Sequence, residues 1–399
     1  MGKFLEDDLL VWNFRFPKRL IAPVLIVLFA KLAGSLLIYY LLNVETSGTF
    51  WTGINVLQGQ QNQVFLLNTI KTDRWLNVFL GWDSAWYLSI LTKGYAFSQQ
   101  SYSFFPGLPF FSGLFNLFFH DPVLSLVFCS LVFGVLWVPV YQLVAESYMS
   151  KGTALVSALL FAMSPYVFLF TTVAYSEGLL LFFVLASWYA FKKGKVAYAS
   201  ILAVFAALSR VVGVIVVVPM LIESLKSKKP HRLRNVLLSC LPVISIFLWL
   251  AYGQLTANDW LALIHTTEWR EMYSFQNLLF NILPARGVQA FFEVPSQHWL
   301  SWFAIWGSLI IPPLLIARAF KTEKSLAVYS LAYFIGALVF GALISMPRFI
   351  SILFPLWLTL TAKFPTSKKS IAFVIILLIV FFVVGLDLWS NFLIGKFIA

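Results

Sequence analysis

Asp83 is the only acidic residue in an aromatic stretch that covers residues 79–111. Trp82, Trp86 and Tyr87 flank it. Aromatic rings pack against the C–H faces of sugars, and a carboxylate can take a proton from a hydroxyl group, so this combination suits sugar chemistry. We therefore predict a catalytic loop at a membrane surface, with Asp83 as general base and the three aromatic residues in contact with substrate. The alternative is an aromatic belt at a membrane interface, in which the acid is simply solvated.

Three further charged residues, Glu177, Arg210 and Arg348, interrupt apolar runs. An ionisable group near the membrane interior costs roughly 2.5 to 3.5 kcal/mol, so each of them needs a partner or a function. An acid with two arginines suits displacement of a phosphate from a lipid-linked sugar, because guanidinium groups neutralise the departing phosphate. We predict that Arg210 and Arg348 bind the donor phosphate and that Glu177 orients Arg210 or the acceptor. The alternative is a structural pair of Glu177 with Arg210 that holds broken helices together.

Other polar residues in apolar surroundings are weaker candidates. His265 and Trp269 are four residues apart and share one face if their segment is helical. We predict that they contact phosphate or acceptor, with a local hydrogen-bonding role as the alternative for His265. Lys31 lies inside the first apolar run, where we expect a structural role: it snorkels, or it pairs with Glu177 or Asp387.

Composition sets the class of protein that must position these residues. Hydrophobic residues make up 60% of the 399 positions, charged residues 11%, and the mean hydropathy is +0.87, which indicates a polytopic membrane protein. The net charge of +12 comes from short basic clusters between apolar runs, as in cytoplasmic loops, so we assign no nucleic-acid partner. Both cysteines lie in apolar runs, and no HExxH, Walker or GxGxxG motif is present. We therefore expect no metal and no cofactor.

Placing each basic cluster in the cytoplasm fixes a topology, since the chain must cross an even number of times between clusters. We predict one all-α domain over residues 1–399, with a cytoplasmic N-terminus (1–19) and two outer loops (43–122 and 253–298). The short apolar segment 104–119 is expected to be a re-entrant or surface helix in the first loop. About eleven crossings are predicted at 20–42, 123–147, 156–172, 176–191, a broken hairpin in 196–225 that turns at 209–213, 236–252, 299–317, 326–344, 349–360 after a turn at 346–348, and 371–389.

At this point the ordered motifs resemble the PIG-V family of mannosyltransferases. The matching elements are, in chain order, WDSAWY at 82–87, GY at 94–95, FFPGLP at 104–109, YSE at 175–177, SRVVG at 209–213, HTTEWR at 265–270, and PRF at 347–349 followed by FP at 354–355. The resemblance implies a GT-C fold, a polyprenyl-phosphate sugar donor, inverting single displacement, and Asp83 as the catalytic aspartate of the first outer loop. It also makes Tyr175 a candidate substrate contact. Gly107 and Leu108 depart from the family pattern, which has Leu and Tyr there.

We therefore predict a mannosyltransferase that moves a hexose from a polyprenyl-phosphate sugar to a lipid- or glycan-linked hydroxyl, without a metal. We expect the protein in a prokaryotic plasma membrane, with its active site on the outer face, or in the endoplasmic reticulum with its active site on the lumenal face if the chain is eukaryotic. Two alternatives stay open: a transporter or flippase of lipid-linked sugars, and a non-catalytic subunit of a transferase complex. Against a transporter, the sequence shows no pair of similar halves, and transport needs no acid ringed by aromatic residues.

Overall fold

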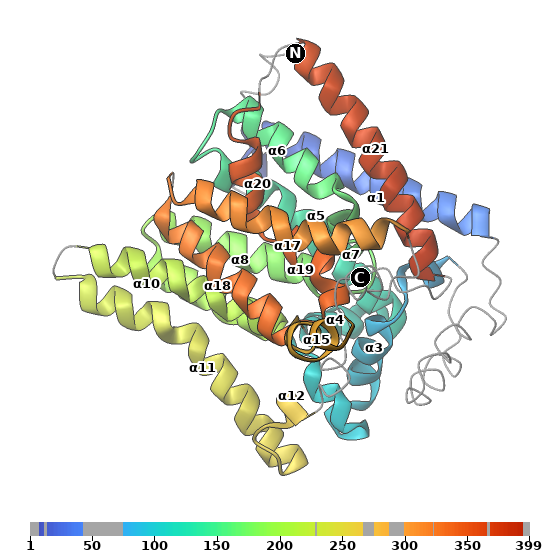
Figure 1. Cartoon of the computed structure of the whole chain (residues 1–399), viewed down its shortest axis with the longest axis vertical. Helices are drawn as coiled ribbons and strands as arrows, with labels where there is room; N and C mark the ends of the chain where they lie inside the picture. The colour runs from blue at the N-terminus through green and yellow to red at the C-terminus, as the bar shows by residue number, and fades with distance from the viewer. Residues whose placement is uncertain are drawn as a thin grey trace.

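The apolar runs fold as helices in the computed structural model, in which helices from both ends of the chain meet (Figure 1). The structure describes residues 8–11, 14–42, 75–227, 230–265, 275–286, 299–321, 323–364 and 368–393. Much of both predicted outer loops, including Trp269, lies outside these residues. The first and last long helices, α1 (Ile21–Leu42) and α21 (Lys368–Leu393), pack against each other, so the two ends of the chain close the same side of the bundle.

The elements of the first half of the chain are β1 (Asp8–Val11), β2 (Phe14–Pro17), the 3-10 turn η2 (Lys18–Leu20), α1, η4 (Leu76–Phe79), α3 (Asp83–Lys93), η5 (Tyr95–Phe97), η6 (Gln99–Ser103), α4 (Gly107–Phe119), α5 (Pro122–Ala145), α6 (Lys151–Met163), α7 (Pro165–Phe170) and α8 (Glu177–Lys192). The second half contains α9 (Val196–Ser209), η7 (Val211–Val216), α10 (Val217–Lys226), α11 (Arg232–Ala257), α12 (Ala262–His265), α14 (Phe275–Asn277), the π-helix η8 (Leu278–Ile282), α15 (Leu283–Arg286), α17 (Trp299–Ala319), α18 (Lys324–Phe340), η9 (Leu343–Ser345), α19 (Met346–Ser351), α20 (Phe354–Thr361) and α21.

Five of the described helices are long and apolar enough to cross a membrane. A sixth crossing is possible if α20 and the segment 343–351, which meet at a bend of 61°, form one broken span. Several other apolar helices, among them α6, α9 and α18, are shorter than 18 residues. The helical membrane architecture is thus confirmed, whereas the number of eleven crossings stays a prediction.

A small antiparallel hairpin departs from the all-α expectation. Strand β1 pairs with β2 in a register that places Asp8 opposite Pro17. Apolar and polar residues alternate in β2, as a strand requires, but four residues are too few for this pattern to stand out beside the long apolar runs.

The segment predicted to cross at 156–172 consists of two helices, α6 and α7, and the crossing itself stays a prediction. The break falls at Ser164, directly before Pro165. Proline disfavours the helical conformation for the residue that precedes it and suits the first position of a new helix, so the run splits there.

The predicted broken hairpin is confirmed. Helix α9 ends at Ser209, Arg210 is extended, and η7 and α10 follow. A Cβ atom on Gly213 would lie 2.1 Å from the carbonyl oxygen of Ala206, so only glycine lets η7 pass this close to α9. Residues 346–348, by contrast, are not the expected turn but the first residues of α19.

The short helix expected at 104–119 is present as α4 and ends at His120. A Cβ atom on Gly107 would lie 2.8 Å from the carbonyl oxygen of Leu208, which explains why this position cannot be leucine here. Leu108 is fully buried in the core. Gly107 therefore lets α4 pack closely against the end of α9, next to Arg210, and Leu108 forms part of the core.

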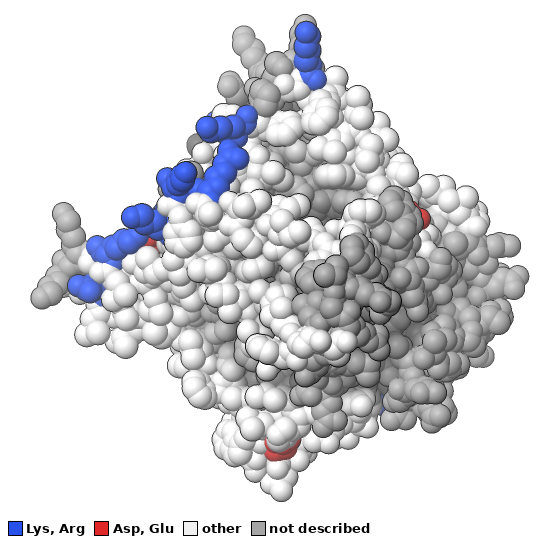
Figure 2. All heavy atoms as spheres, in the orientation of Figure 1, with Lys and Arg blue, Asp and Glu red and all other residues white. Residues whose placement is uncertain are grey.

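Basic side chains gather along one edge of the molecule (Figure 2). The helix ends that carry the predicted cytoplasmic clusters include Lys192 at the end of α8 and Lys226 at the end of α10. Glu177 begins α8, so it lies a full helix of 16 residues, or about 24 Å, from Lys192. The acid and the basic clusters therefore lie at opposite ends of the same buried helix.

Candidate active site

Asp83 is the first residue of α3, and the residue before it has an unusual backbone. Trp82 has φ +46° and ψ −110°, a conformation that bulky residues rarely adopt. Its indole N–H donates to the carbonyl oxygen of Phe392 at 3.2 Å, near the end of α21. The last helix of the chain thus helps to hold the strained turn that presents Asp83, and strain of this kind is common at functional sites.

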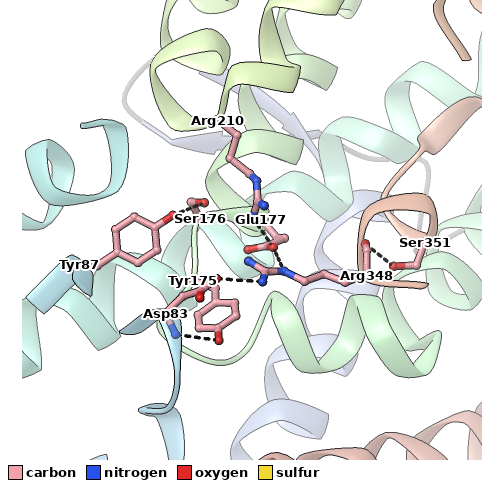
Figure 3. Close-up of polar contacts among 8 residues, drawn as sticks. All are labelled: Asp83, Tyr87, Tyr175, Ser176, Glu177, Arg210, Arg348 and Ser351. Atoms are coloured by element: carbon pink, nitrogen blue, oxygen red, sulfur yellow. Dashed lines mark hydrogen bonds and ion pairs between the residues drawn. The ribbon is translucent and has the colours of Figure 1, made fainter. Parts of the chain in front are cut away.

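Arg348 connects Asp83 to the interior of the protein (Figure 3). Its Nη1 donates to Oδ2 of Asp83 at 2.9 Å, and its Nε donates to Oε1 of Glu177. The guanidinium lies 4.5 Å from the ring centroid of Tyr175 and 4.8 Å from that of Phe170, within cation–π distance of both rings. The two carboxylates are therefore held by one planar group whose own position is fixed by aromatic packing.

Arg210 reaches the same carboxylate oxygen from the other side. Its Nη1 donates to Oε1 of Glu177 at 2.5 Å, and Figure 3 shows Arg210 and Arg348 converging on Glu177 from different segments of the chain. Glu177 is fully buried, whereas 18% of the Arg210 side chain and 27% of the Asp83 side chain are exposed. Two carboxylates and two guanidiniums balance in charge, which makes burial of the group tolerable.

The loop at 171–176 holds this arrangement together. The backbone N–H of Ala174 donates to the carbonyl oxygen of Phe79 at 2.8 Å, next to the turn before α3. Tyr175 Oη accepts the backbone N–H of Asp83 at 3.0 Å, and Ser176 Oγ lies 2.9 Å from the Tyr87 hydroxyl. The loop therefore bonds the Asp83 segment at three places and ends at Glu177.

Lys31 anchors the start of the same loop. It is fully buried in α1, and its Nζ donates to the hydroxyl oxygens of Thr171 at 2.8 Å and Thr172 at 2.9 Å. Both hydroxyls donate in turn to carbonyl oxygens at the end of α7. The expectation that Lys31 snorkels or pairs with Glu177 or Asp387 is wrong, because these threonines provide its bonds within the bundle.

Tyr87 and Tyr175, the two tyrosines that link this loop to α3, act as neutral groups. Burial raises the pKa of Tyr87 to about 12 and raises the pKa of Tyr175 well above its ordinary value. Both phenols therefore stay protonated around neutral pH. They can orient Asp83 and Ser176 by hydrogen bonds, and Asp83 is left as the partly exposed group of the site that can accept a proton.

Two of the predicted aromatic contacts are core residues. Trp86 is buried, and its ring stacks on Phe104 at a centroid distance of 5.4 Å. Tyr87 is buried as well, with Phe104 against its ring edge-on. Neither ring offers an open face to a sugar, whereas Trp82 is only partly buried beside the acid.

His265 takes no part in the cluster that the structure describes. Its Nδ1 lies 2.8 Å from Oδ2 of Asp259, and 57% of its side chain is exposed. This hydrogen bond lowers the pKa of Asp259. The local hydrogen-bonding role for His265 is therefore the one that the geometry favours.

An apolar cavity of about 220 Å³ lies beside the charged cluster. Tyr166 on its wall stacks against Phe170 at a centroid distance of 6.5 Å, and Phe170 in turn lies under the guanidinium of Arg348. The cavity is thus separated from the guanidinium by a single pair of rings. Its walls include Tyr166 of α7, Gly307 and Ile311 of α17, Ile350 of α19, and Trp357 and Leu360 of α20.

The described residues contain no group of three His, Cys, Asp or Glu side chains that could hold a metal ion. What the cluster offers is a partly exposed carboxylate whose Oδ2 is fixed by Arg348, next to guanidinium donors and a hydrocarbon-lined cavity. Such a set can deprotonate a hydroxyl, bind an oxyanion and take up an apolar chain. Sequence reasoning found the four charged residues but missed Lys31 as an anchor, although a lysine inside an apolar run was itself a signal.

Comparison with known proteins gives one family match. The family described as Mannosyltransferase (PIG-V) matches residues 26–272, which include Asp83, Glu177 and Arg210. No curated protein sequence matches the chain.

Similar solved structures include oligosaccharyltransferases of Archaeoglobus fulgidus. One, in complex with Zn and sulfate, has a TM-score of 0.46 and 16% identity over 78% of this chain and 49% of its own. The oligosaccharyltransferase AglB, in complex with an inhibitory peptide and a dolichol-phosphate, has a TM-score of 0.43 and 13% identity over 79% of this chain and 51% of its own. The present chain thus spans about half the length of these proteins.

Proposed function

Because the chain belongs to the PIG-V mannosyltransferase family, we propose that it is an integral membrane mannosyltransferase that uses a polyprenyl-phosphate sugar as donor. The observation that carries this proposal is the network in which Arg348 joins the partly exposed Asp83 to the buried Glu177, with Arg210 on the same oxygen of Glu177. A network of this kind is costly to bury, and a transferase that displaces a phosphate has a use for each member.

In the proposed reaction, Asp83 acts as general base. One oxygen of its carboxylate is held by Arg348, and the carboxylate takes the proton of the acceptor hydroxyl. The acceptor oxygen then attacks the anomeric carbon from the face opposite the phosphate. The bond between that carbon and the phosphate oxygen breaks, the phosphate leaves with the electron pair, and the configuration inverts.

The guanidinium groups stabilise the departing phosphate. Arg210 uses one nitrogen for Glu177 and is partly exposed, so it keeps donors for a ligand. Arg348 uses two of its nitrogens for the carboxylates, and only Nη2 is left. We therefore assign phosphate binding mainly to Arg210, and to Arg348 the additional task of fixing the position of Asp83.

The cavity beside Phe170 supports a lipid-linked donor. A polyprenyl chain is a branched hydrocarbon, and a wall formed mainly by carbon atoms next to a guanidinium suits the junction of such a chain with its phosphate. Among sugar donors, only a lipid-linked one carries both a long hydrocarbon chain and a phosphate. We propose that the first isoprene units of the donor occupy this cavity.

The active site is proposed to face the outer or lumenal side. Glu177 lies at the end of α8 opposite Lys192, and basic clusters favour the cytoplasmic side. The acceptor is proposed to be a lipid- or glycan-linked hydroxyl, and no metal or other cofactor is expected to take part.

The test is to incubate membranes that contain the protein with labelled polyprenyl-phosphate mannose and to identify the labelled product by mass spectrometry. Membranes without the protein are the control. We expect a new mannosylated product that depends on the protein. A flippase would move the labelled lipid across the bilayer without a new glycosidic bond, and a non-catalytic subunit would give no product when purified alone; either result would refute the proposal.

A further inference from the structure

Tyr333 of α18 carries a buried hydroxyl for which the described part of the structure provides no hydrogen-bond partner. Only 2% of the residue is exposed. Buried hydroxyls normally bond another group, because leaving one without a partner costs free energy. An unpaired hydroxyl at this depth therefore points to a ligand, provided that it lies where a ligand could bind.

The position of Tyr333 meets this condition. Its helix, α18, packs against η7, which follows Arg210, and against α19, which carries Arg348. The charges of Arg210, Glu177 and Arg348 all lie close enough to act on the Tyr333 hydroxyl. Tyr329, one turn earlier on the same helix, is buried as well but is not under the influence of these charges.

The charged cluster itself has unpaired atoms. Nη2 of Arg348 and Oε2 of Glu177 are both buried, and neither has a partner among the described residues. Arg348 and Tyr333 thus each offer a free donor. A ligand that satisfies them must bring acceptor oxygens, while the free Glu177 oxygen suits a hydroxyl of the same ligand.

Charge decides which acceptor fits. Asp83 and Glu177 balance the charges of Arg210 and Arg348, so the cluster as a whole is neutral, but its free N–H donors still belong to cations. An anionic oxygen is therefore preferred over a neutral one at this point. A sugar phosphate brings phosphate oxygens for the two donors and a sugar hydroxyl for Glu177.

We propose that Tyr333 is a further donor-binding residue, whose hydroxyl donates to a phosphate oxygen of the lipid-linked donor beside Nη2 of Arg348. This inference rests on the proposed function, since it assumes a lipid-linked sugar phosphate as donor. It adds a neutral hydrogen-bond donor to the two arginines.

The experiment measures binding of defined lipids to the purified full-length protein in detergent. The probes are a short-chain polyprenyl phosphate, the polyprenol of the same length, and the corresponding polyprenyl-phosphate mannose. The variants are Tyr333→Phe and, as matched control, Tyr329→Phe, which removes a hydroxyl from the same helix away from the charges. Thermal unfolding without lipid shows whether either variant is folded.

We expect Tyr333→Phe to bind polyprenyl phosphate about tenfold more weakly, because one hydrogen bond to a charged group is lost. Binding of the polyprenol and the behaviour of Tyr329→Phe should stay as in the wild type. Equal binding of polyprenyl phosphate by Tyr333→Phe and wild type would overturn the inference. So would a loss that affects polyprenol equally, because the hydroxyl would then support the fold.

A third outcome separates phosphate from sugar. If Tyr333→Phe weakens binding of the mannose-bearing lipid but not of polyprenyl phosphate, the hydroxyl contacts the sugar and the inference is wrong. If the wild-type protein itself does not distinguish polyprenyl phosphate from polyprenol, the proposed donor class fails, and this result is visible without any variant.

Discussion

Replacement of Asp83 by asparagine separates chemistry from stability. Asparagine has the same shape, and its side-chain oxygen can still accept the bond from Nη1 of Arg348, which is 2.9 Å long in the structure. It cannot take a proton from an acceptor hydroxyl. A general base is typically worth about 10²- to 10⁴-fold in rate, which corresponds to about 2.7 to 5.4 kcal/mol in the activation barrier.

The stability cost of the same change should be small. The Asp83 side chain is 27% exposed, so solvent already weakens its ion pair with Arg348, and Arg348 keeps its bond to Glu177. We therefore expect a loss of less than about 1 kcal/mol in the free energy of unfolding. The increase in the activation free energy should therefore be several times larger than the decrease in the free energy of unfolding.

The assay compares initial rates of mannose transfer by equal amounts of purified protein, with labelled polyprenyl-phosphate mannose and the acceptor fraction of the membranes. Asp121→Asn is the matched control. Asp121 caps α5 by accepting the backbone N–H groups of Val123 and Leu124, and asparagine caps helices equally well. Turnover of Asp83→Asn at the wild-type rate would refute the mechanism, and an equal loss in both variants would point to a general effect of removing an acid.

Three further changes test the framework of the site. Glu177→Gln removes the carboxylate that the buried guanidinium of Arg348 and the partly exposed guanidinium of Arg210 share, so we expect about 3–5 kcal/mol of destabilisation in thermal or denaturant unfolding; unchanged unfolding would show that the two arginines find other partners. Lys31→Met removes the bonds to the two threonines but leaves an apolar side chain of similar length, so turnover should fall while the unfolding temperature is kept or raised. Normal turnover in that variant would contradict the anchoring role. Gly213→Ala would force a methyl group against a carbonyl oxygen of α9 and should cost about 1–3 kcal/mol. Gly113→Ala, whose new methyl group would lie 3.8 Å from a side-chain carbon of Leu91, should be neutral or slightly stabilising in the same unfolding assay.

The helices were largely predictable because membrane spans are long apolar runs. The first was expected at 20–42 and is Ile21–Leu42; the second was expected at 123–147 and is Pro122–Ala145. Where a predicted span is divided into two helices, at Ser164, a proline follows directly, and its effect on the preceding residue was a usable signal.

The membership of the charged cluster was predictable for a different reason. Charges within apolar segments need partners, so Glu177, Arg210 and Arg348 were expected to meet, and the structure brings them together with Asp83. The pattern of bonds was not predictable. Asp83 and Arg348 are 265 positions apart, and nothing in their local sequences says that Arg348 rather than Arg210 holds the carboxylate of Asp83.

The roles of some residues could not be predicted from the sequence, because segments that are distant in the chain form their surroundings. Trp86 is a residue type that often stacks on sugars, yet Phe104 covers its ring. This coverage depends on how α3 packs against the turns that follow it, which the sequence around Trp86 does not show. Tyr333 is one of several polar residues in an apolar helix, and its proposed role follows from a buried hydroxyl that has no hydrogen-bond partner among the described residues.

The geometry also explains why one short loop matters so much for the proposed reaction. Residues 171–176 are fixed at their start by Lys31, in the middle by the carbonyl oxygen of Phe79, and at their end by Glu177. Arg348 then closes a ring from Glu177 to Asp83, whose backbone returns to Tyr175. In such a closed ring, the position of the carboxylate is set by several contacts at once, so no single contact has to be strong. Rigid positioning of this kind is what a base needs in order to meet a hydroxyl at a defined distance from a departing phosphate.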